Sequence, residues 1–292
     1  MVLQTRPSPA EALPVQRVLR NVGSIRVVDW ECPGHDHGRV EWAARNEIAF
    51  VRSGAFLKRV GAREVTADPG TAIFFSRGEE YRIGHHRACG DRCVILVLPP
   101  AQLEEMVGRP NAAARPFFPS DRAALSRRAV LLLRHLTLIA PGGDPLEVEE
   151  TALRLAGEAI ARAEGCRPGG LSATEGARRR EVEKARAAIA ARSGEPLGLA
   201  EIARETAYSP WHLARVFREV TGRTLHQHLT RVRLLRALDL LGSGFGLSRI
   251  ALDAGFSSHS HFSAAFRREF GAPPSRILST PMEARGGSRD QS

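Results

Sequence analysis

The chain has 292 residues, of which 43% are hydrophobic and 25% charged, values typical of globular proteins that bury a sizeable core. This length favours two domains, since one domain commonly takes roughly 100–200 residues. The formal net charge of +10 indicates a polyanionic partner, although a general richness in arginine would give the same figure. Membrane and secreted disulfide-scaffold proteins are excluded. No apolar run approaches the ~20 residues of a membrane span, no secretory signal is recognisable, and the cysteines are few. We therefore expect a cytoplasmic protein.

Short β-branched and aromatic segments separated by Gly, Pro and Asp fill the region up to about Leu98. The Asp68-Pro69-Gly70 sequence is a strong turn signal among them. This pattern favours an antiparallel sandwich or barrel over residues 15–118. Its aromatic residues are interpreted as sandwich core, with the lining of an effector pocket as the alternative. The predicted strands are Ser24–Asp29, Glu47–Val51, Phe56–Val60, Thr71–Phe75 and Cys93–Leu98, and the aromatic residues are Trp30, Trp42, Phe50, Phe56, Phe74 and Phe75.

A helical hairpin is predicted over residues 119–165. Ser120 and Asp121 offer an N-cap for a helix over Arg122–Ile139, and a run rich in Pro and Gly ends it. A second helix follows over Leu146–Glu164. The pair is expected either to form a dimer interface or to pack against the sandwich. Residues 166–177 are rich in Gly, Pro and Ser and are interpreted as a linker, and the periodicity over residues 178–280 predicts an all-helical domain.

The helical domain contains two similar units, Leu199–Gly222 and Leu247–Gly271. Each has a short helix, a tight turn and a second helix ended by Gly, which is typical of the helix-turn-helix motif. Ser209 and Pro210 are suited to the N-cap and the first helical position of the second helix in the first unit. Gly255 allows a positive φ in the turn of the second unit, whereas the first unit must make its turn at Ala207 or a neighbour without glycine.

The second helix of each unit is predicted to bury one apolar stripe and to present its polar face to DNA. Recognition helices read bases with their N-terminal residues, so Arg215 is expected to bond guanine edges and Trp211 to contact a thymine methyl group or a sugar. His259, Ser260 and Ser263 are the matching residues in the second unit. Solvated surface side chains are the alternative. The buried stripes are Leu213, Val216, Phe217 and Val220, then Phe262, Ala265 and Phe266; the expected phosphate contacts are Arg218, Arg231, Arg233, Arg236 and Arg267.

This spacing resembles the AraC family of bacterial regulators, whose DNA-binding domain is two helix-turn-helix units joined by one helix. The matching pieces are Ser209-Pro-x-His-Leu-x-Arg-x-Phe217, Gly222, Arg233-x-x-x-Ala237-x-x-Leu-Leu241, Ala254-Gly-Phe256, Phe262-x-x-x-Phe266, Gly271 and Pro274. The resemblance implies that a set of positions faces the bases. They are Trp211, His212, Ala214 and Arg215, then His259, Ser260, Ser263 and Ala264.

Three positions depart from the family pattern. Ala264 stands where a basic residue is common, which weakens base reading by the second unit. His228 stands at a usual aromatic position, and the Pro274–Leu278 segment lacks the familiar aromatic-Arg ending. The resemblance nevertheless implies a non-enzymatic regulator that binds promoter DNA as a homodimer, contacts RNA polymerase and more often activates than represses.

The N-terminal domain resembles the cupin-like sensor domain of such regulators, through its strand pattern and through Tyr81, His85 and Gly90-Asp-x-Cys93. The resemblance implies that this domain senses a small molecule or a stress signal. Cupin enzymes bind a metal through a His-x-His and Glu set plus a later His. His35, His37 and Glu41 imitate the first part, but Tyr81 stands near the place of the later His, which argues against a cupin metalloenzyme.

Cys32, His85, Cys89 and Cys93 form a second candidate cluster. A His-x3-Cys-x3-Cys spacing brings together ligand types that suit zinc. The same thiols are candidates for a redox switch, if neighbouring cations lower the pKa of a cysteine. Free cysteines also commonly pack as small hydrophobic residues, in which case no cofactor is needed. We therefore predict a DNA-binding regulator, with a metal- or thiol-sensing regulator as the alternative.

Overall fold

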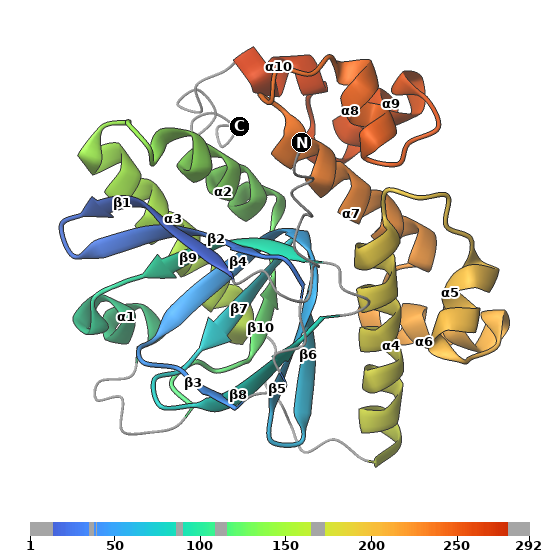
Figure 1. The fold of residues 1–292 in the computed structure, drawn as a ribbon, viewed down its shortest axis with the longest axis horizontal. Helices are drawn as coiled ribbons and strands as arrows, with labels where there is room; N and C mark the ends of the chain where they lie inside the picture. The colour runs from blue at the N-terminus through green and yellow to red at the C-terminus, as the bar shows by residue number, and fades with distance from the viewer. Residues whose placement is uncertain are drawn as a thin grey trace, which may run out of the picture.

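The computed structural model describes residues 14–34, 38, 40–85, 90–108, 116–164 and 173–279 of the chain. An N-terminal β domain (residues 14–164) lies beside a C-terminal helical domain (residues 173–279), as Figure 1 shows. This arrangement confirms the predicted class, an antiparallel β domain with a helical hairpin followed by an all-helical domain. Within the described ranges, no helix has both the length and the apolar character that crossing a membrane requires.

The β domain is built from two antiparallel sheets. Its strands are β1 (Val15–Val22), β2 (Ile25–Cys32), β3 (Glu41–Trp42), β4 (Glu47–Gly54), β5 (Phe56–Val60), β6 (Arg63–Ala67), β7 (Thr71–Phe75), β8 (Glu80–Gly84), β9 (Asp91–Val97) and β10 (Arg122–Ala124). One sheet has the order β1-β2-β9-β4-β7-β10, and the other has the order β3-β8-β5-β6. The strands predicted from the sequence all fall within this set, with ends that differ by a few residues.

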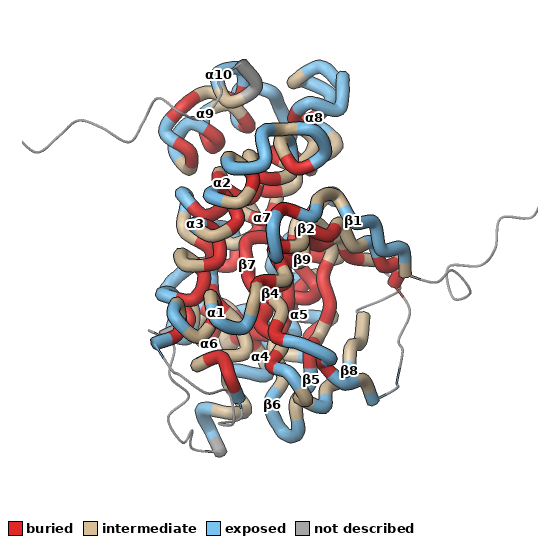
Figure 2. The backbone as a smooth tube through the Cα atoms, turned by 90° about the vertical axis from the view of Figure 1, so that its left-hand side faces the viewer, coloured by how far each residue is buried: buried red, intermediate tan, exposed pale blue. Residues whose placement is uncertain are grey.

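The central strands of the six-stranded sheet are buried on both faces. Successive side chains of a strand point to opposite sides, and here both sides face a core. Ile48 and Phe50 of β4 belong to a large core on the face covered by helices, whereas Ala49 and Val51 belong to a smaller core facing the second sheet. Figure 2 shows the result: buried residues run through β2, β4, β7 and β9, while β1 at the edge is largely exposed. The predicted sandwich core therefore has two layers.

Three helices complete the β domain: α1 (Pro100–Val107), α2 (Arg127–Ile139) and α3 (Pro145–Glu164). The prediction that a helix begins at Arg122 is wrong, since residues 122–124 form β10 and pair with β7. Ser126, not Ser120, caps α2, and its hydroxyl accepts a hydrogen bond from the Ala129 N–H at 2.9 Å. The available edge of β7 outweighs the helical preference of the Arg-Ala-Ala segment. The hairpin packs on the six-stranded sheet and leaves Leu138 and Leu146 exposed.

The helical domain contains α4 (Ala173–Arg192), α5 (Leu199–Thr206), α6 (Pro210–Thr221), α7 (Leu225–Leu240), α8 (Leu247–Asp253), α9 (His259–Phe270) and α10 (Pro274–Ser279). The pairs α5–α6 and α8–α9 are the two predicted helix-turn-helix units, and α7 joins them. Of the predicted linker over residues 166–177, residues 166–172 lie outside the described ranges. Residues 173–177 belong to α4, so that part of the linker prediction is wrong.

The two domains are packed together along α4 and α7. Helix α4 contacts β6, and α7 contacts β4. The second unit shares the large core of the β domain, to which α7 contributes Leu234, Leu235 and Leu238 and α9 contributes Phe262 and Phe266. The first unit instead forms a core of its own with α4 and the first half of α7. The two units are therefore supported by different parts of the molecule.

Candidate nucleic-acid interface and inner cavity

The first unit makes its turn as the sequence requires. Ala207 adopts the left-handed conformation with φ of 62°, and among the described residues it is the one non-glycine residue with positive φ. The Ser209 hydroxyl then caps α6 by accepting a hydrogen bond from the His212 N–H at 3.3 Å, and Pro210 takes the first helical position. Gly222 ends the helix with φ of 71°. These local signals fix where α6 begins and how its N-terminal turn is presented.

Helix α6 buries three of the four residues of its predicted stripe. Leu213, Val216 and Phe217 are fully buried, but Val220 is 41% exposed because the core of the first helix-turn-helix unit ends before the last turn of the helix. On the opposite side Trp211 is 73% exposed. The Arg215 guanidinium lies 5.4 Å from the centre of the Trp211 ring, where a cation–π interaction is favourable. The exposed Trp211 ring thus lies against the half-buried Arg215.

The other two candidates on α6 have partners within the protein. The His212 ring nitrogen Nε2 lies 3.0 Å from Glu181 Oε2 on α4. Ala214 is half-buried against the core of the first helix-turn-helix unit. Arg215 also has a partner, the Glu219 carboxylate at 2.8 Å, and its side chain is 38% exposed, close to the 36% of His212. Trp211 is therefore the most accessible residue of this set.

The second unit presents a more polar and less bulky surface. Gly255 has φ of +92°, and an added Cβ would lie 2.5 Å from the Ser193 carbonyl oxygen, so this turn requires glycine. Ser258 caps α9, and its hydroxyl accepts a hydrogen bond from the His261 N–H at 3.2 Å. The predicted stripe of Phe262, Ala265 and Phe266 is buried. The predicted base-reading residues lie together on the opposite face: His259, Ser260 and Ala264 are exposed, and Ser263 is half-buried.

The five arginines predicted at DNA phosphates divide into two groups. Arg218 on α6 and Arg267 on α9 are exposed. Arg233 instead donates hydrogen bonds to the carbonyl oxygens of Ser193 at 2.8 Å and Glu195 at 2.7 Å, just beyond the end of α4. Arg231 bonds the Glu269 carboxylate and the Leu125 carbonyl oxygen, and Arg236 lies half-buried beside Gly194. The three arginines of α7 therefore hold structural positions that sequence periodicity did not reveal.

Buried charges connect the two domains. Asp68, in the turn between β6 and β7, is fully buried and accepts hydrogen bonds from Arg186 of α4 at 2.5 and 3.0 Å. The His228 Nε2 atom lies 3.1 Å from the same carboxylate. Burial would raise the pKa of Asp68, but Arg186 and His228 hold that pKa well below its usual range. Burial lowers the pKa of His228 more than Asp68 raises it. This contact thus joins a carboxylate, a guanidinium and a neutral imidazole.

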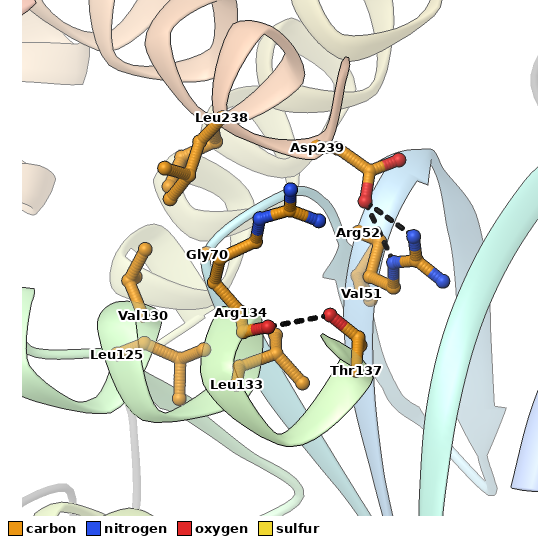
Figure 3. A pocket seen from close by; sticks show the side chains of 11 residues that line it. Val51, Arg52, Gly70, Leu125, Val130, Leu133, Arg134, Thr137, Leu238 and Asp239 are labelled. Carbon is orange, nitrogen blue, oxygen red and sulfur yellow. Dashed lines mark hydrogen bonds and ion pairs between the residues drawn. The ribbon is translucent and has the colours of Figure 1, made fainter. Parts of the chain in front are cut away.

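A second ion pair and a small cavity lie at the same boundary. Arg52 of β4 bonds Asp239 of α7 at 2.6 and 2.7 Å, beside Arg134 of α2 (Figure 3). The cavity between them has a volume of about 30 Å³. This is room for roughly one water molecule and too small for an effector.

A larger cavity of about 270 Å³ lies inside the β domain. Aromatic residues form one part of its lining, and polar residues form another. The former are Trp30, Phe56, Phe75 and Tyr81, and the latter are Glu41, Glu47, His85, Asp91, Cys32 and Cys93. The interpretation of the aromatic residues as core holds for Phe50 and Phe74, which are buried. It is wrong for Trp42, which is 62% exposed because β3 is a short edge strand.

Three members of the predicted Cys/His cluster line this cavity, and a carboxylate joins them. Asp91 Oδ1 lies 2.7 Å from His85 Nε2, and the Cys93 thiol donates to Asp91 Oδ2 at 3.2 Å. Burial alone would lower the pKa of His85, but hydrogen bonds with Asp91 and Cys32 raise it to about 10. Cys89, His35 and His37 lie outside the described residues. Asp91 was missed, although its place two residues before Cys93 on a strand puts both on one face.

Two family models match the chain. An AraC-binding-like domain matches residues 3–163, and a helix-turn-helix domain matches residues 202–280. Among curated proteins, the regulatory protein SoxS of Salmonella typhimurium is 40% identical over 82 residues, which are 28% of this chain and 77% of SoxS. The probable transcription factor PqrA of Proteus vulgaris is 35% identical over 84 residues, 28% of this chain and 69% of PqrA.

Among solved structures, a DNA-binding transcriptional dual regulator from Escherichia coli K-12 is 31% identical and aligns with a TM-score of 0.32. The alignment covers 34% of this chain and 88% of that protein.

Proposed function

The chain belongs to the AraC family of transcriptional regulators and is a DNA-binding transcription regulator. On that premise we propose that it reads a promoter site with α6 and α9, and that an effector bound in its β domain regulates this binding. The observation that carries the proposal is the pair formed by Trp211 and Arg215. An exposed Trp with an Arg guanidinium beside its ring, on the N-terminal half of a recognition helix, fits direct reading of bases in the major groove.

The two units would contribute unequally to sequence reading. Helix α6 offers a guanidinium and a large aromatic ring. Helix α9 offers His259, Ser260 and Ser263, which form weaker or less selective contacts, and Ala264, which can contact a thymine methyl group. Arg218 and Arg267 are placed to contact phosphates and so to fix orientation without reading sequence. We therefore assign most of the sequence preference to α6.

The cavity of the β domain is the proposed effector site. Its volume of about 270 Å³ and its mixed aromatic and polar lining suit a small molecule with an apolar body and a polar or cationic group. An effector regulates DNA binding only if it has different affinities for two arrangements of the domains. The polar contacts of Asp68 and Arg52 with the helical domain would differ between the two arrangements of the domains.

The remaining roles rest on the family alone. We propose a cytoplasmic homodimer that contacts RNA polymerase and activates transcription. The exposed Leu138 and Leu146 of the helical hairpin are candidates for the dimer surface. Sedimentation equilibrium of wild-type protein and of a Leu138→Glu, Leu146→Glu variant tests this surface. A dimer that persists unchanged in the variant would place the interface elsewhere.

The proposed DNA reading is tested by selecting a binding site from random-sequence DNA and titrating it with the full-length protein over a series of salt concentrations. Arg215→Ala is expected to cost about 1–3 kcal/mol of binding free energy and to relax the preference at one base pair. Arg218→Ala is expected to weaken all sequences equally and to reduce the salt slope by about 1.

Arg154→Ala is the matched control, because Arg154 is an exposed arginine of α3, a helix of the β domain that belongs to neither helix-turn-helix unit. It should leave both affinity and salt slope unchanged. If Arg215→Ala and Trp211→Ala both retain wild-type affinity and specificity, α6 does not read the site and the proposal fails.

A further inference from the structure

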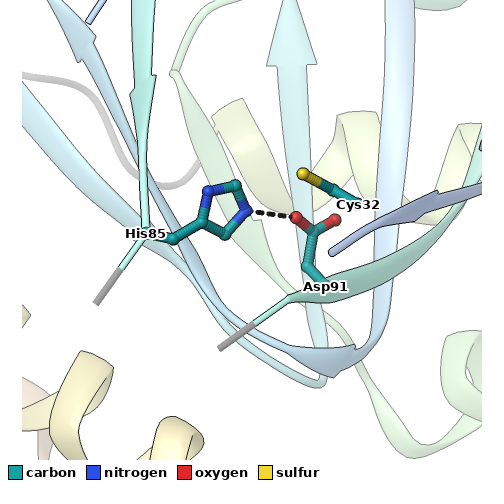
Figure 4. A group of neighbouring side chains, drawn as sticks. All are labelled: Cys32, His85 and Asp91. Atoms are coloured by element: carbon teal, nitrogen blue, oxygen red, sulfur yellow. Dashed lines mark hydrogen bonds and ion pairs between the residues drawn. The ribbon is translucent and has the colours of Figure 1, made fainter. Parts of the chain in front are cut away.

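The wall of the inner cavity holds a compact group of metal-ligating side chains. Cys32, His85 and Asp91 each offer one ligand atom, and these atoms lie within 4.8 Å of one another. Figure 4 shows the three side chains converging from three different segments. The side chains of His85 and Asp91 are 1% and 3% exposed, and Cys32 is buried. The group is thus enclosed by protein and accessible from the cavity.

The topology of the β domain builds this group from both sheets. In the β2–β9 ladder Cys32 lies directly opposite Asp91, so their side chains point to the same face. His85 directly follows β8 of the other sheet and reaches across to Asp91. These three ligands differ from the His35, His37 and Glu41 set that the cupin resemblance suggests. Strand pairing fixes the positions of Cys32 and Asp91, and His85 directly follows a paired strand, which favours a preformed site.

The geometry distinguishes this group from a catalytic Cys-His-Asp relay. In a relay the thiol and the carboxylate bond opposite nitrogens of the imidazole ring, which keeps them apart. Here the sulfur, one ring nitrogen and one carboxylate oxygen surround a common point, as ligands of one ion do. Tetrahedral zinc with bond lengths of 2.0–2.3 Å holds its ligand atoms about 3.3–3.8 Å apart. A bound ion would therefore replace the 2.7 Å hydrogen bond between His85 and Asp91, whose two ligand atoms would separate slightly.

The register also argues against a disulfide between Cys32 and Cys93. Cys93 pairs with Trp30, so the two cysteines are diagonal neighbours across the β2–β9 ladder. Diagonal Cα atoms in antiparallel sheets lie about 7–8 Å apart, beyond the usual 4.4–6.8 Å of a disulfide. The Cys93 thiol instead donates a hydrogen bond to Asp91 Oδ2 at 3.2 Å.

We propose that Cys32, His85 and Asp91 bind one Zn²⁺ ion in the wall of the cavity, with the fourth position directed to the space that the effector enters. A thiolate and a carboxylate neutralise the two charges of the ion, which is what a buried site requires. Mixed sulfur, nitrogen and oxygen ligands suit zinc better than magnesium or calcium. The inference rests on the proposed role of this cavity as the effector site, because a coordinating group of the effector would take the open position.

Cys93 is a positioning residue in this arrangement. Its thiol donates to Asp91 Oδ2 and leaves Oδ1 on the side of His85. Hydrogen bonds of this kind orient a carboxylate ligand, and their loss typically lowers metal affinity by about 10–100-fold. Cys93→Ala should therefore weaken the site by that factor. Cys93→Ser, which keeps a donor, should retain more of the affinity.

The test is a titration of the purified full-length protein with Zn²⁺ in competition with a colorimetric chelator, followed by a titration with Co²⁺ alone. The expected result is one ion per chain. Bound Co²⁺ should show the visible bands of a tetrahedral complex and a near-ultraviolet thiolate band. Cys32→Ser should abolish the thiolate band, and Asp91→Asn should lower the affinity at least tenfold.

Far-ultraviolet circular dichroism shows whether each variant is folded, and His85→Gln provides a second ligand variant if Cys32→Ser is not. Failure of wild-type protein to bind stoichiometric Zn²⁺, or a thiolate band that survives in Cys32→Ser, overturns the inference. Binding to the selected DNA site is measured on the same samples. Intact DNA binding without metal binding refutes only the zinc site, whereas loss of sequence preference in α6 variants refutes the proposed DNA reading.

Discussion

Asp68 and Arg186 form a bidentate ion pair across the domain boundary, with oxygen–nitrogen distances of 2.5 and 3.0 Å and no exposed surface on the Asp68 side chain. Asp68 belongs to a turn of the β domain and Arg186 to the first helix of the helical domain. Breaking a buried pair leaves the other charge without compensation, which typically costs about 3–5 kcal/mol. This pair therefore makes the position of the helical domain sensitive to a single turn of the β domain.

Asp68→Asn should lower the free energy of unfolding at pH 7 by about 3 kcal/mol, because it removes the carboxylate that hydrogen-bonds the buried Arg186 guanidinium. Urea denaturation followed by circular dichroism measures the loss. Asp253→Asn is the control: Asp253 pairs with Arg249 at a surface position of α8, where such pairs contribute less than about 1 kcal/mol. Equal effects of the two variants would contradict the importance of the buried pair.

The stabilising effect of Asp68 should depend on pH in a definite sense. Its pKa is held below the value of an unfolded chain, about 3.9. The contribution is therefore fully present above that value and is lost as the pH falls toward the pKa of the folded state. In a His228→Phe background, which removes the coupled titration of the neighbouring imidazole, the stability lost on Asp68→Asn should be constant from pH 5 to 7 and shrink below about pH 4. A difference that grows on acidification would refute this assignment.

His228 should make the domain boundary sensitive to mild acid. Its pKa is lowered by burial, despite Asp68 nearby, and Arg186 and Arg223 also lower it. An unfolded histidine binds a proton near pH 6.5 while the buried one does not, so stability is present above that pH and falls below it. His228→Phe should reduce the fall in unfolding free energy between pH 7 and 5.5. If both proteins lose the same stability, His228 does not carry the effect.

The turn of the first unit can be improved. A left-handed conformation costs an alanine roughly 1–2 kcal/mol, a cost that glycine avoids. Glycine also has greater conformational freedom in the unfolded chain, which offsets part of the stability gained by the substitution. Ala207→Gly should therefore raise the free energy of unfolding by about 0.5–1 kcal/mol. Gly255→Ala, at the equivalent turn of the second unit, should lower it by more than about 2 kcal/mol, because the new Cβ meets the Ser193 carbonyl oxygen.

Ala214→Gly within α6 separates the effect of the turn from a general effect of glycine. It should cost about 1 kcal/mol, the usual penalty inside a helix. If Ala214→Gly also stabilises the protein, the positive φ of Ala207 does not explain the effect of Ala207→Gly.

Glu219→Gln should tighten DNA binding. Glu219 bonds Arg215 at 2.8 Å and holds the guanidinium within the helix surface. Its removal frees Arg215 and takes a negative charge away from the DNA phosphates. An exposed pair of this kind is worth about 0.2–1 kcal/mol, so affinity should increase about 1.5–5-fold at low salt. Weaker binding in the titration would show that the Glu219 contact orients Arg215 for reading.

Local signals in the sequence were sufficient for the helix-turn-helix units. Ser209, Pro210 and Gly222 mark the two ends of α6, and helical periodicity identified its buried face apart from Val220. The same signals failed at Arg122, where pairing with a distant strand overrides local preference. They also failed at Arg231 and Arg233, because an exposed arginine and one that bonds a distant carbonyl oxygen look alike in a periodic pattern.

The site in the β domain was predictable only in part. Cys32 and His85 were recognised as ligand types, and Cys93 was grouped with them. Asp91 completes the group because strand pairing places it opposite Cys32. The spacing of residues along the chain does not predict the register in which two strands distant in sequence pair. The contacts of Asp68 with Arg186 and His228 were missed for the same reason.

The separate support of the two helix-turn-helix units has a consequence for how the protein opens. Phe262 and Phe266 of the second unit share one continuous core with the β domain, whereas Phe217 of the first unit lies in a core of its own. Amide protons of α9 should therefore exchange with solvent only when most of the chain unfolds. Those of α6 should exchange through a partial opening of lower free energy. The helix that carries Trp211 and Arg215 is thus free to adapt to DNA while its twin stays fixed.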